Sequence, residues 1–335
     1  MGCNLGGEAP KPSLEPSPHD EQKVKTNPHD EQKASPRDEQ KEKAINREVI
    51  PEFLREKSAQ VEQTQFIHTH NIQSLCATDD GVWIASSDST ELVQMDSDGE
   101  RGRSVEMVSG IEGISMSPLS GRLWICCDDS TIREMTLPES VHSPPESAQV
   151  RFETGCMCIC VTYNEYIVIG TYMDVTIYSQ DGEVVLSTQN VPGSNIIKPY
   201  KLAACKKSRR IAVADWDDAV CGGEDNPNVA VFNERLEFLH RYHGETNLMK
   251  KRKAAVTKFL PYDLCFDQQG LLLVVDYKIR CINIIDTGGH FLRLLLALPT
   301  SAVSPICLNL HNNQLWVGCS DKSLKVYKYD ELTEN

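Results

Sequence analysis

The chain has 335 residues, with 48 acidic and 34 basic side chains and a formal net charge of −14 at pH 7. It contains no run of 18 apolar residues and no charged leader followed by an apolar core, so it predicts neither a membrane-spanning helix nor a secretory signal. An acidic surface repels phosphate backbones unless a local basic patch is present, which disfavours nucleic acid as a partner. We therefore expect a cytoplasmic protein.

The first segment, residues 1–43, shows no apolar periodicity and repeats one phrase. The phrase Pro-His-Asp-Glu-Gln-Lys occupies residues 18–23 and 28–33, and Pro-Arg-Asp-Glu-Gln-Lys occupies residues 36–41. Such a segment cannot bury enough apolar surface to offset its chain entropy. The sequence predicts a disordered N-terminal tail.

The extreme N-terminus, Met1-Gly2-Cys3, allows myristoylation at Gly2 and palmitoylation at Cys3, although position 6 is glycine where the motif has Ser or Thr. Together the two acyl chains would anchor the protein. We expect membrane association only if Gly2 or Cys3 is acylated. The next segment, residues 44–62, is predicted to be a short helix, broken near Pro51, or a linker.

A repeated unit follows, from about residue 63 to residue 330. Each copy has an apolar run, a turn, a second run often centred on tryptophan, an Asp-containing turn and a third run. The second runs centre on Trp83, Trp124, Val168, Ala212, Val274 and Trp316, so the successive steps are 41, 44, 44, 62 and 42 residues. A period just above 40 residues is what four short strands and their turns occupy in a propeller blade. The sequence predicts an all-β, six-bladed β-propeller.

The sixth unit ends at Tyr327–Tyr329 with only three strands. We expect Gln65–Thr69 to supply the fourth strand, because pairing both ends of the chain in one blade removes an open sheet edge. The propeller is therefore expected to span residues 63–330, with residues 331–335 as a short tail. We expect a monomer.

One unit carries a family resemblance. Pro261–Gly270, the run Leu272–Asp276, Arg280–Asp286 and Gly289–Leu292 resemble an NHL repeat. The most similar NHL propellers lie at the C-terminus of tripartite-motif ubiquitin ligases and bind proteins or RNA. No RING or B-box Cys/His ladder accompanies this one, so the resemblance implies docking without ligase activity. A WD-repeat propeller, which usually closes with seven blades, is the alternative family.

The 62-residue step contains two long insertions on the face that carries the D-to-A and B-to-C loops. Residues 215–228 form an acidic loop and residues 245–258 a basic one. Long insertions in an economical repeat are usually functional. The candidate partner-binding residues are Trp216 as an anchor, Asp217, Asp218, Glu224, Asp225, Lys250, Lys251, Arg252 and Lys253. The alternative is that the two loops only neutralise each other.

Two other functions compete with a protein-binding scaffold or adaptor. RNA binding is disfavoured because the basic stretch Lys206–Arg210 falls on the face opposite Lys250–Lys253. A metal-dependent hydrolase would use axial side chains, for which the candidates are His70, Asn71, Glu112 and Asp263. These come from only three blades, so we predict no catalytic residue, metal or cofactor.

The thirteen cysteines lie within apolar runs and lack the paired spacing of a disulfide framework or a zinc site. Cys156, Cys158 and Cys160 alternate, which would place three thiols on one face of a strand. We expect them to be reduced core residues.

Overall fold

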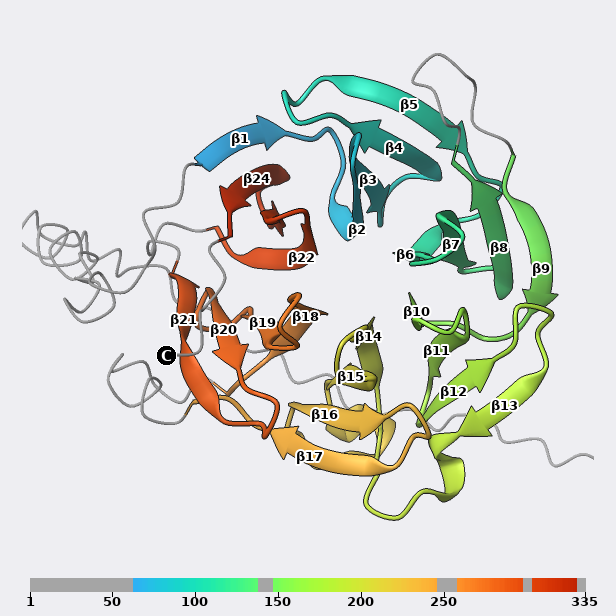
Figure 1. Ribbon diagram of the computed structural model, residues 1–335, viewed down its shortest axis with the longest axis vertical. Helices are drawn as coiled ribbons and strands as arrows, with labels where there is room; N and C mark the ends of the chain where they lie inside the picture. The colour runs from blue at the N-terminus through green and yellow to red at the C-terminus, as the bar shows by residue number, and fades with distance from the viewer. Residues whose placement is uncertain (1–62, 138–146, 246–257, 298–302, 330–335) are drawn as a thin grey trace, which may run out of the picture. The chain divides into compact units, whose positions relative to one another are not determined.

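Six four-stranded antiparallel sheets stand around a central channel in the computed structural model, which describes residues 63–137, 147–245, 258–297 and 303–329 (Figure 1). The all-β, six-bladed propeller predicted from the repeat is confirmed. The tail and linker of residues 1–62, the acylation sites Gly2 and Cys3, the tetrad Lys250–Lys253 and the end from residue 330 lie outside the described residues.

The strands follow the chain blade by blade. Blade 1 has β2 (Ile72–Thr78), β3 (Gly81–Ser86), β4 (Glu91–Met95) and β5 (Arg101–Glu106), and blade 2 has β6 (Ile111–Met116), β7 (Arg122–Cys127), β8 (Thr131–Thr136) and β9 (Gln149–Glu153). Blade 3 has β10 (Cys158–Val161), β11 (Ile167–Thr171), β12 (Asp174–Tyr178) and β13 (Val184–Ser187), and blade 4 has β14 (Pro199–Ala204), β15 (Arg210–Asp215), β16 (Asn228–Asn233) and β17 (Phe238–Tyr242). Blade 5 has β18 (Pro261–Phe266), β19 (Leu272–Asp276), β20 (Cys281–Ile285) and β21 (Phe291–Ala297). Blade 6 has β22 (Pro305–His311), β23 (Gln314–Cys319), β24 (Ser323–Lys328) and β1 (Gln63–Ile67).

Within a blade the strands run from A at the channel to D at the rim. The loops from D to the next A and from B to C emerge on one side of the ring, here called the D–A face. The turns from A to B and from C to D emerge on the other side, here called the A–B face. The described ranges contain only two short 3-10 helices, η1 (Thr188–Asn190) and η2 (Ala219–Cys221), and no helix there could cross a membrane.

The ring is closed by the two ends of the chain. β1 pairs antiparallel with β24, from Gln63 opposite Tyr327 to Ile67 opposite Ser323. The ends of the chain close the ring as predicted, although the strand spans Gln63–Ile67, two residues before the predicted Gln65–Thr69. Its pairing covers the edge that β24 would otherwise leave open.

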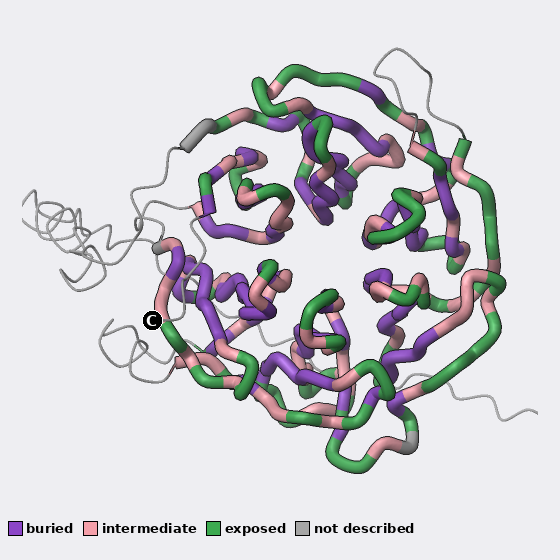
Figure 2. Tube along the Cα trace, viewed as in Figure 1, coloured by how far each residue is buried: buried purple, intermediate pink, exposed green. Residues whose placement is uncertain are grey.

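The core consists of six apolar layers, each between two neighbouring blades. Trp83, Trp124 and Trp316 occupy equivalent B-strand positions and are at most 1% exposed. They fill the layers between blades 1 and 2, 2 and 3, and 6 and 1. In blade 5 the strand register places Leu273 at this position, one residue before the centre assigned from the sequence. Figure 2 shows buried residues along the inner strands and exposed residues on the outermost ones.

Five A strands share a local irregularity. In blades 1, 2, 4, 5 and 6 the pairing of A with B skips the second residue, so that Gln73, Glu112, Tyr200, Tyr262 and Ile306 are bulged. A bulge re-aims a side chain and bends the strand. These residues lie at the end of the channel on the D–A face.

Polar side chains of the A strands link neighbouring blades. Each accepts a hydrogen bond from a backbone amide on the channel-facing edge of the next A strand. Such an amide has no partner within its own sheet. The pairs are Ser74 Oγ with Ile114 N (3.3 Å), Ser115 Oγ with Val161 N (3.0 Å), Asp263 Oδ2 with Leu308 N (2.9 Å) and Asn309 Oδ1 with Ala77 N (3.1 Å).

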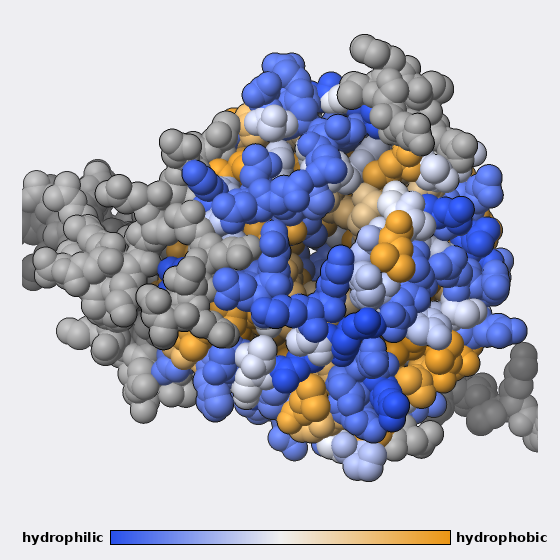
Figure 3. Space-filling model, viewed as in Figure 1, coloured by the Kyte–Doolittle hydropathy of each residue, from blue (hydrophilic) through white to orange (hydrophobic). Residues whose placement is uncertain are grey.

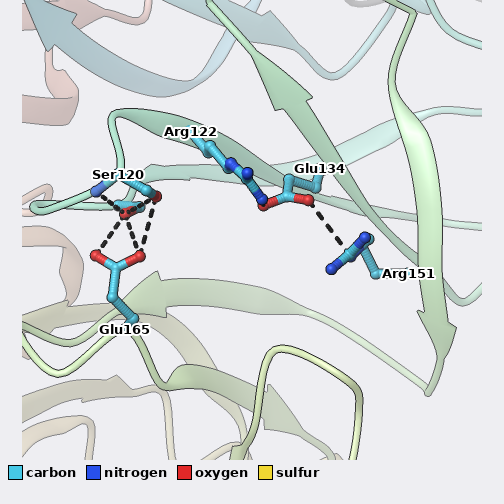
Figure 4. A network of polar contacts seen from close by, with 6 residues as sticks. Ser120, Arg122, Glu134, Arg151 and Glu165 are labelled. Carbon is cyan, nitrogen blue, oxygen red and sulfur yellow. Dashed lines mark hydrogen bonds and ion pairs between the residues drawn. The ribbon is translucent and has the colours of Figure 1, made fainter.

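A carboxylate on the A–B face adds a further link between blades 2 and 3 (Figure 4). Glu165 accepts hydrogen bonds from the hydroxyls of Ser117 (2.5 Å) and Ser120 (3.0 Å) and from the amide of Leu119 (3.0 Å). Within blade 2, Glu134 lies between Arg122 (2.9 Å) and Arg151 (3.3 Å). Both carboxylates therefore fix strands and turns.

The cysteine prediction needs one correction. Cys158 and Cys160 are buried in β10, but Cys156 precedes the strand and is only half-buried, so the three thiols do not form one row. Burial raises the pKa of the Cys158 and Cys160 thiols, which favours their protonated form. The twelve cysteines of the described ranges are all free thiols.

Candidate functional site

Four aromatic rings form a continuous stack on the D–A face at blades 4 and 5. Tyr200 and Tyr262 are bulged residues at the start of β14 and β18, while Trp216 and Tyr277 follow the B strands β15 and β19. Trp216 stacks on Tyr200 with ring centroids 3.8 Å apart, and Tyr262 stacks on Tyr277 at 4.4 Å. Trp216 and Tyr262 join the two pairs at 5.2 Å. All four rings are half-buried, so each keeps surface for a ligand.

Trp216, the predicted anchor, is held in place from several sides. Its indole N–H donates to the carbonyl oxygen of Pro261 at 2.8 Å, which ties the B-to-C loop of blade 4 to blade 5. The Lys198 ammonium lies 5.4 Å from the ring centroid and 3.3 Å from Asp218. A ring fixed in this way loses little rotamer entropy when a partner binds.

The acidic loop is organised by its own carboxylates. Asp217 accepts hydrogen bonds from the amides of Glu224 (3.1 Å) and Asn226 (3.2 Å). Asp218 accepts from Val220 N (2.9 Å) and caps η2, and this hydrogen bond together with Lys198 lowers the pKa of Asp218. A Cβ atom at Gly223 would lie 2.2 Å from Asp217 Oδ1. The loop therefore has a defined conformation.

The two insertions meet at one ion pair. Lys258, the last residue of the basic insertion, pairs with the Asp225 carboxylate and also donates to the Asp225 carbonyl at 3.0 Å. Among the residues that the structure describes, the Glu224 carboxylate has no such partner. Of the predicted acidic residues, Asp217, Asp218 and Asp225 thus shape the loop, and Glu224 projects from it.

The rest of the D–A face carries exposed apolar side chains in its loops and at the end of β1. Val220, in the same B-to-C loop as Trp216, is 94% exposed. The others are Ile67, the last residue of β1 in blade 6, and Val108, Tyr172 and Met173 in loops of blades 1 and 3. Sequence reasoning found Trp216 but missed these residues and the three tyrosines, because only the folded ring brings them to one face.

Of the four axial residues considered for an enzyme, Glu112 is the bulged residue of β6, and the other three have partners. Asn71 donates from its side chain and its amide to Asp88 (3.1 and 2.9 Å), and His70 lies 3.6 Å from the same carboxylate. Asp263 accepts from the amides of Leu264 (2.8 Å) and Leu308 (2.9 Å). No group of three or more His, Cys, Asp or Glu side chains within the described ranges is arranged to hold a metal ion.

A cavity of about 700 Å³ occupies the channel and opens on the A–B face. Figure 3 shows the hollow at the centre of the ring, surrounded mainly by hydrophilic side chains. All six A strands line the cavity, and at its inner end lies Lys201, which is only 6% exposed. The predicted basic stretch Lys206–Arg210 lies in the turn after β14, on the face opposite the aromatic stack. There Arg209 covers the Tyr163 ring at 4.8 Å.

No protein-family model and no curated protein sequence matches the chain. Solved structures do match it. The β-propeller domain of Cps50 (Swd1) from Myceliophteria thermophila is 14% identical with a TM-score of 0.53, and the match covers 78% of this chain and 85% of that one. A catalytically inactive virginiamycin B lyase from Staphylococcus aureus, solved with quinupristin, is 10% identical with a TM-score of 0.55, over 81% and 100% of the two chains. At these identities the likeness shows the β-propeller fold alone.

Proposed function

We propose that the protein is a non-catalytic, cytoplasmic scaffold or adaptor that binds a protein partner through the D–A face at blades 4 and 5. The observation that carries this proposal is the half-buried stack of Tyr200, Trp216, Tyr262 and Tyr277. Tyrosine and tryptophan dominate the energetic centres of protein interfaces, where they offer large, rigid apolar surfaces.

The surroundings of the stack favour a protein over a small ligand. Val220 is exposed in the same loop as Trp216, and the exposed apolar residues of blades 1, 3 and 6 extend the contact area across the face. The acidic loop at Glu224 supplies a charged rim. We expect the partner to place an apolar or aromatic side chain against Trp216 and a basic side chain near Glu224.

We further propose that the blades are NHL-type repeats and that the channel performs no catalysis. The recurrent aspartate of the repeat has a structural use that fits this reading. Asp215 and Asp276 end their B strands and accept amide hydrogen bonds from the preceding D-to-A loop, at Lys198 N (2.7 Å) and Leu260 N (3.5 Å). The axial carboxylate Asp263 is likewise committed to backbone amides.

The test compares the proteins captured by variants of the two faces. Trp216→Ala and Val220→Asp alter the D–A face, and Tyr166→Asp places a charge at a 40% exposed position on the A–B face as a matched control. We expect the specific partners of the wild type to be lost with both D–A variants, as measured by quantitative cross-linking mass spectrometry, and retained with Tyr166→Asp. Unchanged partners in Trp216→Ala and Val220→Asp would contradict the proposed face.

A further inference from the structure

The channel cavity has the size of a small-molecule site. Its volume of about 700 Å³ lies within the range of about 300–1,000 Å³ that ligand pockets occupy. Leu75, Ile114 and Leu308 of the A strands are among its lining residues, although each is at most 5% exposed and packs in a layer between two blades. The cavity opens on the A–B face, away from the proposed docking surface, so it raises a separate question of function.

Lys201 is the unusual residue of this cavity. Its ammonium reaches across the channel and donates to the Gln73 carbonyl of blade 1 at 2.9 Å, with the Tyr200 ring 5.7 Å away on the side of the D–A face. β14 and β2 face each other across the ring in Figure 1. An ammonium group has three hydrogens to donate. Within the described ranges, no acceptor is found for the other two, although the side chain is 94% buried.

Burying a charged donor without a hydrogen-bond acceptor costs free energy. The two unpaired N–H groups of Lys201 therefore favour binding of a ligand that brings an acceptor into the cavity. The nearby carboxylate does not fill this role. Asp263 and Lys201 occupy equivalent positions directly after the bulges of adjacent blades. However, no ion pair joins them among the described contacts, and each Asp263 oxygen already accepts a backbone amide.

The charges around the cavity limit what the acceptor can be. Asp263 at the inner end and Asp79 and Asp80 at the mouth are acidic, while Lys206 and His311 line the mouth with them. These carboxylates repel an anion of high charge such as a phosphate ester. A single carboxylate can take both open Lys201 donors in charge-assisted hydrogen bonds.

We propose that the central cavity binds a small organic monocarboxylate, with its carboxylate at Lys201 and the rest of the molecule in the channel between the A strands. The carboxylate enters from the A–B face and stops where Lys201 spans the channel. This site is independent of the protein-docking surface, so either proposal can fail while the other stands.

The experiment measures binding of octanoate to the full chain by saturation-transfer NMR, beside octanol and octylamine, which share its chain but not its charge. We expect the wild type to bind octanoate about tenfold more tightly than octanol, as a charge-assisted hydrogen bond implies. Lys201→Met should lose this preference. Lys207→Met, in the same turn as Lys206 but outside the cavity lining, should keep it. Equal affinity of the wild type for octanoate and octanol, or an unchanged preference in Lys201→Met, would overturn the proposal.

A second variant covers the case in which Lys201→Met does not fold. Leu310→Trp retains Lys201 and narrows the cavity, because Leu310 is part of its lining. We expect octanoate binding to be lost in this variant, with an unchanged circular dichroism spectrum. Retained octanoate binding in a folded Leu310→Trp variant would place the ligand elsewhere and refute the site.

Discussion

Asp263 experiences two opposing influences on its protonation. Burial raises its pKa to about 6, while Lys201 and the amides of Leu308 and Leu264 act in the opposite direction. Burial has the larger effect because it removes water from the whole carboxylate. Asp263 thus links two blades through hydrogen bonds that would be stronger if its carboxyl were ionised. Its burial, however, favours the protonated form.

This balance predicts a pH-dependent contribution to stability. The folded-state pKa of about 6 lies above the ordinary value of 3.8, so the folded chain binds the proton more tightly than the unfolded one. The contribution is greatest below pH 3.8 and falls as the pH rises to 6, by about 3 kcal/mol. In urea titrations from pH 4 to 7, the free energy of unfolding of the wild type should fall relative to that of Asp263→Asn. A difference that stays constant with pH would show that Asp263 titrates normally.

At the scale of the strands, β1 is the element that makes blade 6 complete. Phe66 of β1 packs on the apolar layer between blades 6 and 1. Gly99 leaves room for this ring, since a Cβ atom there would lie 1.8 Å from Phe66 Cδ1. The strand β1 therefore binds blade 6 through apolar contacts as well as through backbone hydrogen bonds. It comes from the opposite end of the chain from β24.

Removing the Phe66 ring should weaken this closure. We expect Phe66→Ala to lower the free energy of unfolding by about 2 kcal/mol, less than for a fully buried phenylalanine. Leu292→Ala is the matched control, because Leu292 is 46% exposed on the outer strand of a covalently continuous blade. The Leu292→Ala substitution should lower the free energy of unfolding by less than about 0.5 kcal/mol. Equal losses in the two variants, measured by urea denaturation, would mean that β1 adds no packing of its own.

The blades and the closure of the ring could be predicted from the sequence alone. Trp83, Trp124 and Trp316 recur at one strand position, and the last unit has one strand fewer than the others. The blade around Ala212 was harder to recognise, since alanine replaces the large residue there. Trp216 could be singled out within an insertion. Its partners Tyr200 and Tyr262 could not, because their bulges turn them towards it only in the folded ring. Lys201 was missed for the same reason, as its acceptor lies on the blade across the channel.

At the scale of the whole molecule, each apolar layer is shared by two blades, so no blade buries its core alone. The side-chain to amide hydrogen bonds that join four pairs of neighbouring A strands add to this coupling. We expect one cooperative unfolding transition for the propeller, with coincident urea curves by tryptophan fluorescence and by circular dichroism. Trp83, Trp124 and Trp316 report from three separate layers. Separated curves would indicate that groups of blades unfold independently.

The pairing of β1 with β24 also determines how the molecule responds to mechanical load. Gln63 lies opposite Tyr327, so the chain enters and leaves this pair at the same end. A force applied between the two termini therefore opens the backbone hydrogen bonds one pair at a time, as in unzipping, instead of shearing all of them together. Optical-tweezers pulling through the termini should release blade 6 at a lower force than pulling through cysteines placed on Gln65 and Gln314. We therefore expect the propeller to unfold cooperatively in denaturant but to open first at the β1–β24 pair under tension along its own chain.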